Sequence, residues 1–114
     1  MAFDDLELKK IDKTVGERFR NRVPPELQDK LRFEYRIEGQ NVIISEVRPR
    51  WDKPEEKLAL DFAKLRYIRK TGIWKLYWMR KTGKWELYEA KGEAKHLKTL
   101  VNAMEEDRYG CFFG

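Results

Sequence analysis

The middle of the chain alternates apolar and polar residues with the period of a β-strand. The range Arg32–Glu38 alternates strictly between apolar and charged side chains, which indicates a half-buried strand. Gly39-Gln40 suits a two-residue turn with glycine first, and the range Asn41–Val47 then supplies the partner strand. Pro49 cannot donate a hydrogen bond within a sheet, so this strand is predicted to end there or to lie at an edge of the sheet. These residues therefore predict a β-hairpin.

The string RKTGxWxLY occurs twice, first over Arg69–Tyr77 and again over Arg80–Tyr88. A repeated string indicates a repeated piece of structure. Each copy places a Thr-Gly pair between runs of aromatic and branched residues, which is typical of a tight turn between antiparallel strands. The range Ala63–Tyr88 is therefore predicted to form a three-stranded meander.

The parity of the two turns decides which side chains share a face of this meander. If both loops have even length, Trp74, Trp78 and Trp85 point together to one apolar face. The opposite face is then mostly basic, with aromatic residues between the charges. The side chains of this face and its turns that we expect to contact a ligand are Lys64, Arg66, Lys75, Tyr77, Lys81, Lys84 and Tyr88.

The stretch between the hairpin and the meander has two parts. Arg50–Lys57 has no periodicity and contains a proline, so it is predicted to be a loop. Apolar residues alternate from Leu58 to Phe62, and then the parity shifts at Ala63. The shift predicts either a β-bulge near Phe62 and Ala63 or a break between two strands.

Helical patterns flank these strands. Asp4 and Glu7 have the spacing of a helix capping box, and an apolar stripe with helical spacing follows them. A second apolar stripe with helical spacing falls in Glu93–Glu106, and we expect Phe112 and Phe113 in the tail to dock on the body of the protein. The order of elements predicts an α+β fold in which a two-stranded hairpin and a three-stranded meander form an antiparallel sheet of about five strands. The N-terminal and C-terminal helices are expected on one face of this sheet, within a single domain over residues 1–114.

Composition narrows the class of protein. A charged fraction of 39% and the absence of any long apolar run exclude a membrane span, and the N-terminal residues do not resemble a secretory signal. Cys111 is the only cysteine and His96 the only histidine, so the chain has neither an internal disulfide nor a set of zinc ligands. We expect a cytoplasmic protein without a metal or cofactor.

The net charge of +5 is unevenly distributed. Eight Lys or Arg residues and no Asp or Glu lie between Phe62 and Trp85, whereas the rest of the chain holds seventeen basic and twenty acidic residues. Such a local excess attracts nucleic acid or another polyanion, or serves only solubility. The preferred hypothesis is a non-catalytic binding module in which the basic face neutralises phosphates and Tyr77 and Tyr88 stack on bases.

Two alternatives remain open. An enzyme would centre on Glu46, with Arg48 and Arg50, because Glu46 falls opposite Phe33 on the apolar face, where burial raises the pKa of a carboxyl and a nearby arginine lowers it. A protein-interaction module, including a homodimer, would use Trp51, which lies outside the alternating pattern. The sequence leaves the oligomeric state open.

Four strings carry a resemblance to a known family: YRIEGQ at 35–40, EVRPRW at 46–51, WKLYWMR at 74–80 and the terminal CFFG. Through them nearly the whole chain resembles the bacterial domain-of-unknown-function family 3024. The resemblance implies a stand-alone bacterial protein and carries over no activity, cofactor or catalytic residue.

Overall fold

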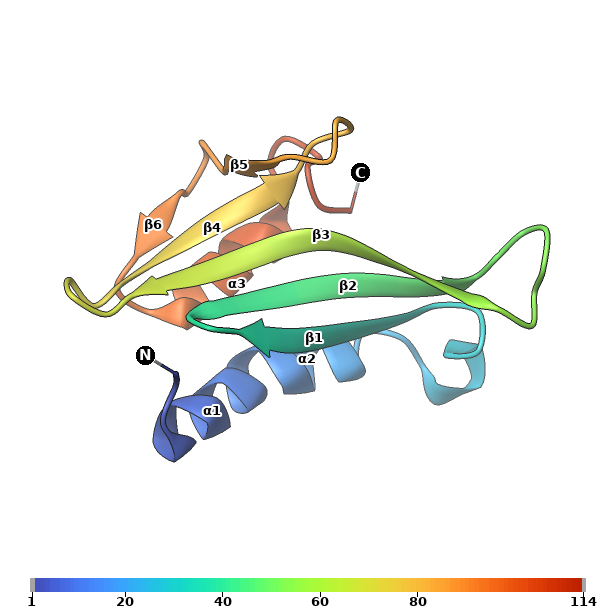
Figure 1. Cartoon of the computed structure of the whole chain (residues 1–114), viewed down its shortest axis with the longest axis horizontal. Helices are drawn as coiled ribbons and strands as arrows, with labels where there is room; N and C mark the ends of the chain where they lie inside the picture. Colours follow the sequence, from blue (N-terminus) through green and yellow to red (C-terminus); the bar gives the residue numbers. More distant parts are fainter. Residues whose placement is uncertain (1, 114) are drawn as a thin grey trace.

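A six-stranded antiparallel sheet forms one layer of the molecule, as Figure 1 shows for the computed structural model, which describes residues 2–113. Its strands are β1 (Arg32–Glu38), β2 (Asn41–Pro49), β3 (Lys57–Ile68), β4 (Ile73–Met79), β5 (Trp85–Leu87) and β6 (Glu93–Ala94). Their order is β1-β2-β3-β4-β5, and β6 pairs with β4 at the end of that strand that β5 leaves free. The predicted hairpin and meander are confirmed, and β6 adds a short strand to the five expected.

Both helices cover one face of the sheet, as predicted. The first helix, here called the N-terminal helix, consists of α1 (Asp5–Ile11), the π-helical turn η1 (Asp12–Gly16) and α2 (Glu17–Arg20); after the 3-10 turn η2 (Pro25–Leu27) and the sheet comes the second helix, α3 (Leu97–Glu106). Figure 1 shows both helices behind the sheet, and their buried side chains form one core with the strands. No helix of residues 2–113 is long and apolar enough to cross a membrane. We call the face that these helices leave uncovered the outer face.

The spacing of the buried stripe explains the π-helical turn. Ile11, Val15 and Phe19 are buried at intervals of four residues. Four residues of an α-helix rotate by about 400°, so a stripe with this spacing drifts by about 40° at every step. A π turn contains one more residue than an α turn and brings the stripe back toward the sheet. Gly16 closes this turn, and a Cβ atom there would lie 2.9 Å from the ring of Tyr35.

The first hairpin and the parity shift agree with the sequence pattern. Glu46 lies opposite Phe33 in the β1–β2 register, and β2 ends at Pro49. In the β2–β3 register Ala63 pairs with Ile44 and Asp61 pairs with Ser45, so Phe62 has no partner on β2. Of the two predicted explanations the bulge is therefore correct, since β3 runs through it without a break.

The two copies of the repeated string form loops of different parity. Ile68 pairs with Ile73, which leaves four residues in the first loop, an even number, as predicted. Met79 pairs with Trp85, which leaves five residues in the second loop, an odd number. A change of one residue turns every following side chain to the other face of the sheet.

The odd loop corrects the predicted orientation of β5. Trp85 lies on the outer face, whereas Trp74 and Trp78 point toward the helices. Tyr88 points toward the helices too and is only 1% exposed, with its ring 4.9 Å from that of Phe112. The prediction of three inward tryptophans is therefore wrong for Trp85, and the prediction of an outward Tyr88 is wrong as well.

The C-terminal helix was predicted over Glu93–Glu106, and the structure differs from this prediction only at the start of the helix. Because Glu93 and Ala94 pair with β4, α3 begins at Leu97. Asp107 follows the helix with a left-handed φ of 46°, and its carboxylate accepts hydrogen bonds from the backbone amides of Phe112 at 3.0 Å and Phe113 at 2.7 Å. These bonds hold the tail against the core, which confirms that Phe112 and Phe113 dock on the body.

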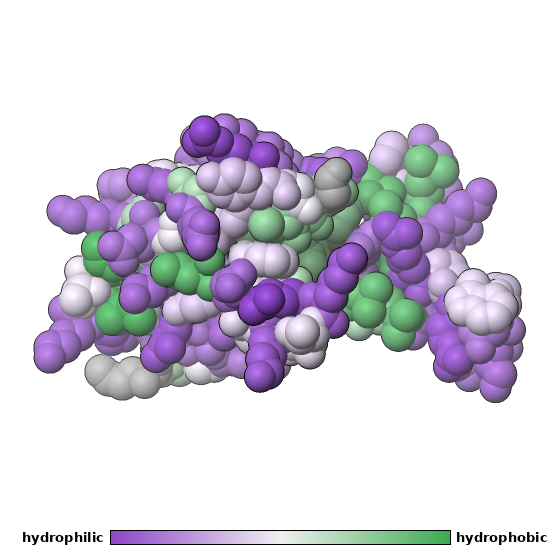
Figure 2. All heavy atoms as spheres, turned by 90° about the horizontal axis from the view of Figure 1, so that it is seen from above, coloured by the Kyte–Doolittle hydropathy of each residue, from purple (hydrophilic) through white to green (hydrophobic). Residues whose placement is uncertain are grey.

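An extension of β2 and β3 projects from one end of the sheet. We call residues 48–60, which include the predicted loop after Pro49, the β2–β3 arm, and Figure 1 shows it reaching beyond the other strands at the right. Lys57 ties the arm to the body by donating a hydrogen bond to the carbonyl oxygen of Asp29 at 2.8 Å. Figure 2, seen from above, shows apolar surface near the same end, where Leu58 and Leu60 are exposed.

Candidate functional site

A cluster of cations and aromatic rings occupies the β3–β5 half of the outer face. The pairing of β3 with β4 places Lys64 beside Tyr77 and Arg66 beside Lys75. The pairing of β4 with β5 adds Trp85 to the same face. We call these five residues, Lys64, Arg66, Lys75, Tyr77 and Trp85, the basic patch. Four of them were predicted from the sequence, and the structure brings these four together.

Lys64 reaches two aromatic rings of the basic patch. Its Nζ atom is 4.8 Å from the ring centroid of Tyr77 and 5.2 Å from that of Trp85. Both distances fit a cation–π contact, which fixes the ammonium over the rings. Partial burial lowers the pKa of Lys64 from its ordinary value, and the charge of Arg66 lowers it further. An anion placed here would relieve that repulsion.

The two halves of the outer face differ in how their cations are compensated. On β1 and β3, Arg36 donates two hydrogen bonds to Asp61, at 2.8 and 3.0 Å, and a third to Glu38. Lys64, Arg66 and Lys75 form no ion pair within residues 2–113. The positive charge of the outer face is therefore concentrated on the β3–β5 half.

The rim of the basic patch contains charges of both signs. Lys81 and Lys84 lie in the exposed β4–β5 loop, so they extend the positive charge beyond the end of the strands. Glu93 in β6 is the register partner of Lys75 and puts one carboxylate on the opposite rim. An extended anion would thus gain most by running from the sheet toward the β4–β5 loop.

Tyr88 does not belong to this site, and Trp85 does. Burial raises the pKa of Tyr88, and its ring packs among the core residues on the helical face. The predicted pair of facing tyrosines is replaced by Tyr77 and Trp85, which both contact Lys64. No local sequence signal finds Trp85, because Lys70-Thr71-Gly72 in the even loop repeats Lys81-Thr82-Gly83 in the odd one, and both glycines have a positive φ, +70° and +83°.

The residues of the enzyme alternative are not brought together as one group. Glu46 is half-buried on the helical face and accepts hydrogen bonds from Nε and Nη2 of Arg48. Arg50 instead forms ion pairs with Asp52 and Glu56 inside the arm. The part of the chain that the structure describes contains no group of three or more His, Cys, Asp or Glu residues that could hold a metal ion.

Trp51 lies at the tip of the β2–β3 arm with 94% of its surface exposed. Leu58 and Leu60 on the same arm are 48% and 49% exposed. Exposed apolar side chains on one projecting element are typical of a contact surface for another protein. The residue predicted as an interaction anchor is therefore accessible, and it lies on a different part of the molecule from the basic patch.

The architecture and the surface define the class of this protein. It is a small α+β protein with an antiparallel sheet that has both helices on one face and an accessible basic and aromatic patch on the other. A family model described as Domain of unknown function (DUF3024) matches residues 3–114, so the chain belongs to this family. No curated protein and no solved structure matches the chain.

Proposed function

We propose that the protein is a non-catalytic binding module whose basic patch binds a polyanion, with single-stranded nucleic acid as the preferred class. The observation that carries the proposal is the contact of Lys64 with both Tyr77 and Trp85, close to Arg66 and Lys75, on a face without helices. Sheets that bind single strands combine an aromatic centre with a basic surround in this way.

The chemistry of a single strand matches both parts of the patch. Exposed bases can stack on Tyr77 and Trp85, since every base has a π-face, and each stacked base is worth about 1–3 kcal/mol. The cations Lys64, Arg66 and Lys75, with Lys81 and Lys84 at the rim, would neutralise phosphates. Each neutralised phosphate of a single strand contributes about −0.7 to the slope of log affinity against log salt, so about five contacts predict a slope of −3 to −4.

The test is the binding of a fluorescein-labelled oligothymidylate, followed by fluorescence anisotropy at several salt concentrations. The double variant Lys64→Glu with Lys75→Glu is expected to abolish binding, because it reverses two of the three central charges. The double variant Lys30→Glu with Lys53→Glu is the matched control, since it changes the net charge equally at exposed positions outside the patch. It is expected to retain most of the affinity.

Equal losses in the two double variants would show that only net charge matters and would contradict a specific site. Absence of binding by the unaltered protein at low salt would end the proposal. The proposal includes a cytoplasmic location, where nucleic acid is available and the free thiol of Cys111 stays reduced.

A second candidate function, protein association, is favoured by the exposure of Trp51 on the β2–β3 arm. If the arm joins two copies of the chain, sedimentation velocity at high concentration will detect a dimer, and Trp51→Ala will shift it to monomer. A monomer at every concentration would refute self-association through the arm. Oligothymidylate binding by Trp51→Ala is expected to be unchanged, because the arm lies outside the basic patch.

A further inference from the structure

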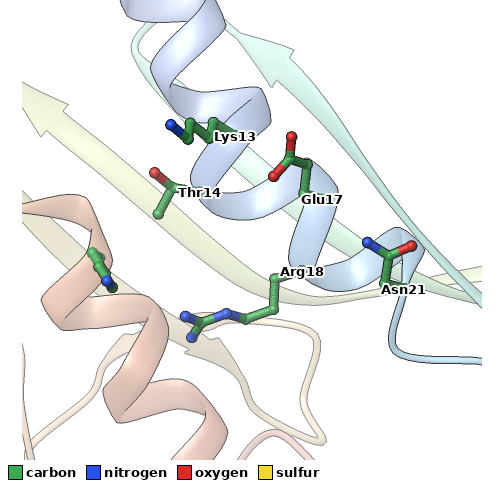
Figure 3. Close-up of a pocket in the computed structure, with 6 residues that line it drawn as sticks. Lys13, Thr14, Glu17, Arg18 and Asn21 are labelled. Carbon is green, nitrogen blue, oxygen red and sulfur yellow. The ribbon is translucent and has the colours of Figure 1, made fainter.

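A groove separates the N-terminal helix from α3 on the helical side of the molecule. It consists of two adjoining cavities of about 420 and 370 Å³, which share the lining residues Lys13, Thr14 and Lys98. Figure 3 shows the first cavity, with Arg18 reaching from the N-terminal helix toward α3 and with Lys13 and Thr14 on the same side of that helix. Either volume falls in the range of small-molecule sites in proteins, which begins at about 300 Å³.

Cations from both helices line this groove. Lys10 and Lys13 come from the N-terminal helix. Lys95 lies just before α3, and Lys98 lies in the first turn of α3. None of these four lysines forms an ion pair within residues 2–113. Four uncompensated charges around one cavity favour a ligand with more than one negative charge.

The carboxylates of the groove leave this positive charge largely intact. Glu7 is held by two hydrogen bonds from Arg69, at 2.9 and 3.2 Å, and it also accepts one from the backbone amide of Asp4. These bonds lower the pKa of Glu7, so its carboxylate stays ionised and remains paired with Arg69. Glu17 lines only the first cavity, which leaves the second with four lysines and one paired carboxylate.

The second cavity also has an apolar wall. Tyr67 and Trp74 from the sheet contribute to it, with Ile11 and Leu97 from the two helices. Trp74 is fixed in place, because its ring lies 5.7 Å from that of Phe3 in a stacked arrangement and 4.9 Å from that of Tyr67. A rigid aromatic wall opposite a group of lysines suits a molecule with a charged end and an apolar or aromatic body.

Two features of the helices also favour a binding site in this groove. The π turn η1, which includes Lys13 and Thr14, lies on the wall of the groove, and such turns occur frequently at functional sites. Arg18 reaches across the groove and donates a hydrogen bond to Asn102 at 2.7 Å, which links the two helices.

We propose that this groove binds a small phosphorylated molecule with an aromatic or apolar body, of about the size of a nucleoside monophosphate. The phosphate contacts Lys10, Lys13, Lys95 and Lys98, and the body lies against the edge formed by Tyr67 and Trp74. This site is separate from the basic patch, because it lies on the helical side of the sheet.

The test uses adenosine monophosphate as the probe and follows two-dimensional NMR of the ¹⁵N-labelled protein. Shifts are expected at the backbone amides of Thr14 and Lys98 and at the indole of Trp74. Adenosine, which lacks the phosphate, and inorganic phosphate, which lacks the body, are each expected to bind at least about tenfold more weakly.

Two double variants locate the charges. Lys13→Glu with Lys98→Glu is expected to weaken binding of adenosine monophosphate at least about tenfold, and the control Lys30→Glu with Lys53→Glu is expected to leave it within about twofold. The same spectra report whether each variant is folded. Should Lys13→Glu with Lys98→Glu fail to fold, Lys10→Glu with Lys95→Glu tests the same cavity.

Three results would overturn the proposal: no shifts in the groove at millimolar probe, equal effects of the groove and control variants, or inorganic phosphate binding as tightly as adenosine monophosphate. Lys64→Glu with Lys75→Glu should retain the groove site. This retention separates failure of the groove proposal from failure of oligonucleotide binding at the basic patch.

Discussion

Arginines, rather than lysines, form the ion pairs among the residues that the structure describes. Each of the ten ion pairs within residues 2–113 has an arginine as its cation. The planar guanidinium can engage both oxygens of a carboxylate, as Arg36 does with Asp61 and Arg20 with Asp12. The lysines of the basic patch and of the groove remain free to meet an external anion.

Asp12 provides a prediction about stability in acid. Arg20 and the Tyr35 hydroxyl both donate hydrogen bonds to it, and they lower the pKa of its carboxyl from 3.8 to about 2. A lowered pKa in the folded state stabilises the protein above the unfolded value, and this contribution is lost as the pH falls from about 4 toward 2. Asp12→Asn is therefore expected to be less stable than the unaltered protein at pH 7, with a difference that disappears near pH 2.

Urea unfolding of both proteins across this pH range measures the difference. Glu7 and Asp61 also have lowered pKa values because of Arg69 and Arg36, but they are present in both proteins and cancel. A difference in stability that stays constant from pH 7 to pH 2 would contradict the role of the Asp12 charge.

Trp74 and Trp85 are predicted to affect different properties. Trp74 is 8% exposed and packed between Phe3 and Tyr67, so Trp74→Ala should lower the free energy of unfolding by about 3–5 kcal/mol. Trp85 is half-buried on the outer face, so Trp85→Ala should cost about 1 kcal/mol or less in stability and should weaken oligothymidylate binding by about 1–3 kcal/mol. Urea unfolding and anisotropy measure the two effects, and a reversed pattern would contradict the observed register.

Elements with strong local periodicity could be predicted from the sequence. The β1–β2 hairpin follows from its strict alternation and its glycine-first turn. The change of parity marks the irregularity at Phe62, but the structure was needed to decide for a bulge over a break. The capping box at Asp4 and Glu7 forms as predicted. The same periodicity placed Lys64, Arg66, Lys75 and Tyr77 on one face, and this part of the candidate site agrees with the structure.

Elements fixed by distant contacts could not be predicted in the same way. Both copies of Arg-Lys-Thr-Gly are compatible with an even or an odd loop, and the second becomes odd where Tyr88 is buried against Phe112 from the C-terminal tail. The start of α3 is similar, since Glu93 and Ala94 fit the helical pattern yet pair with the free part of β4. In each case packing between segments far apart in sequence overrides the local pattern.

The C-terminal tail provides a prediction at the level of elements. Asp107 combines a left-handed backbone with a carboxylate that binds two tail amides. Asp107→Gly keeps the backbone favourable but removes both bonds, so it should lower the free energy of unfolding by about 1–3 kcal/mol. Asp107→Asn keeps one oxygen acceptor, so its free energy of unfolding should lie between those of the unaltered protein and Asp107→Gly. Urea unfolding gives the order, and an Asp107→Gly protein as stable as the unaltered one would contradict the role of the carboxylate.

The three candidate binding surfaces lie on different parts of the molecule. The basic patch occupies the outer face of the sheet, the groove lies on the helical side, and the β2–β3 arm projects from the end. Ligands of the first two surfaces would not compete for space, since the sheet lies between them. Simultaneous binding of an oligonucleotide and a small phosphorylated molecule is thus compatible with this architecture.

The position of an oligonucleotide on the sheet tests the central claim most directly. Two-dimensional NMR of the ¹⁵N-labelled protein, titrated with oligothymidylate at low salt, is expected to shift the indole signal of Trp85 and the amide signals of Lys64, Arg66, Lys75 and Tyr77. The indole of Trp74, on the helical face, should stay in place. Shifts confined to the helical side, or no shifts at the basic patch, would contradict the claim that this face of the sheet is the binding site.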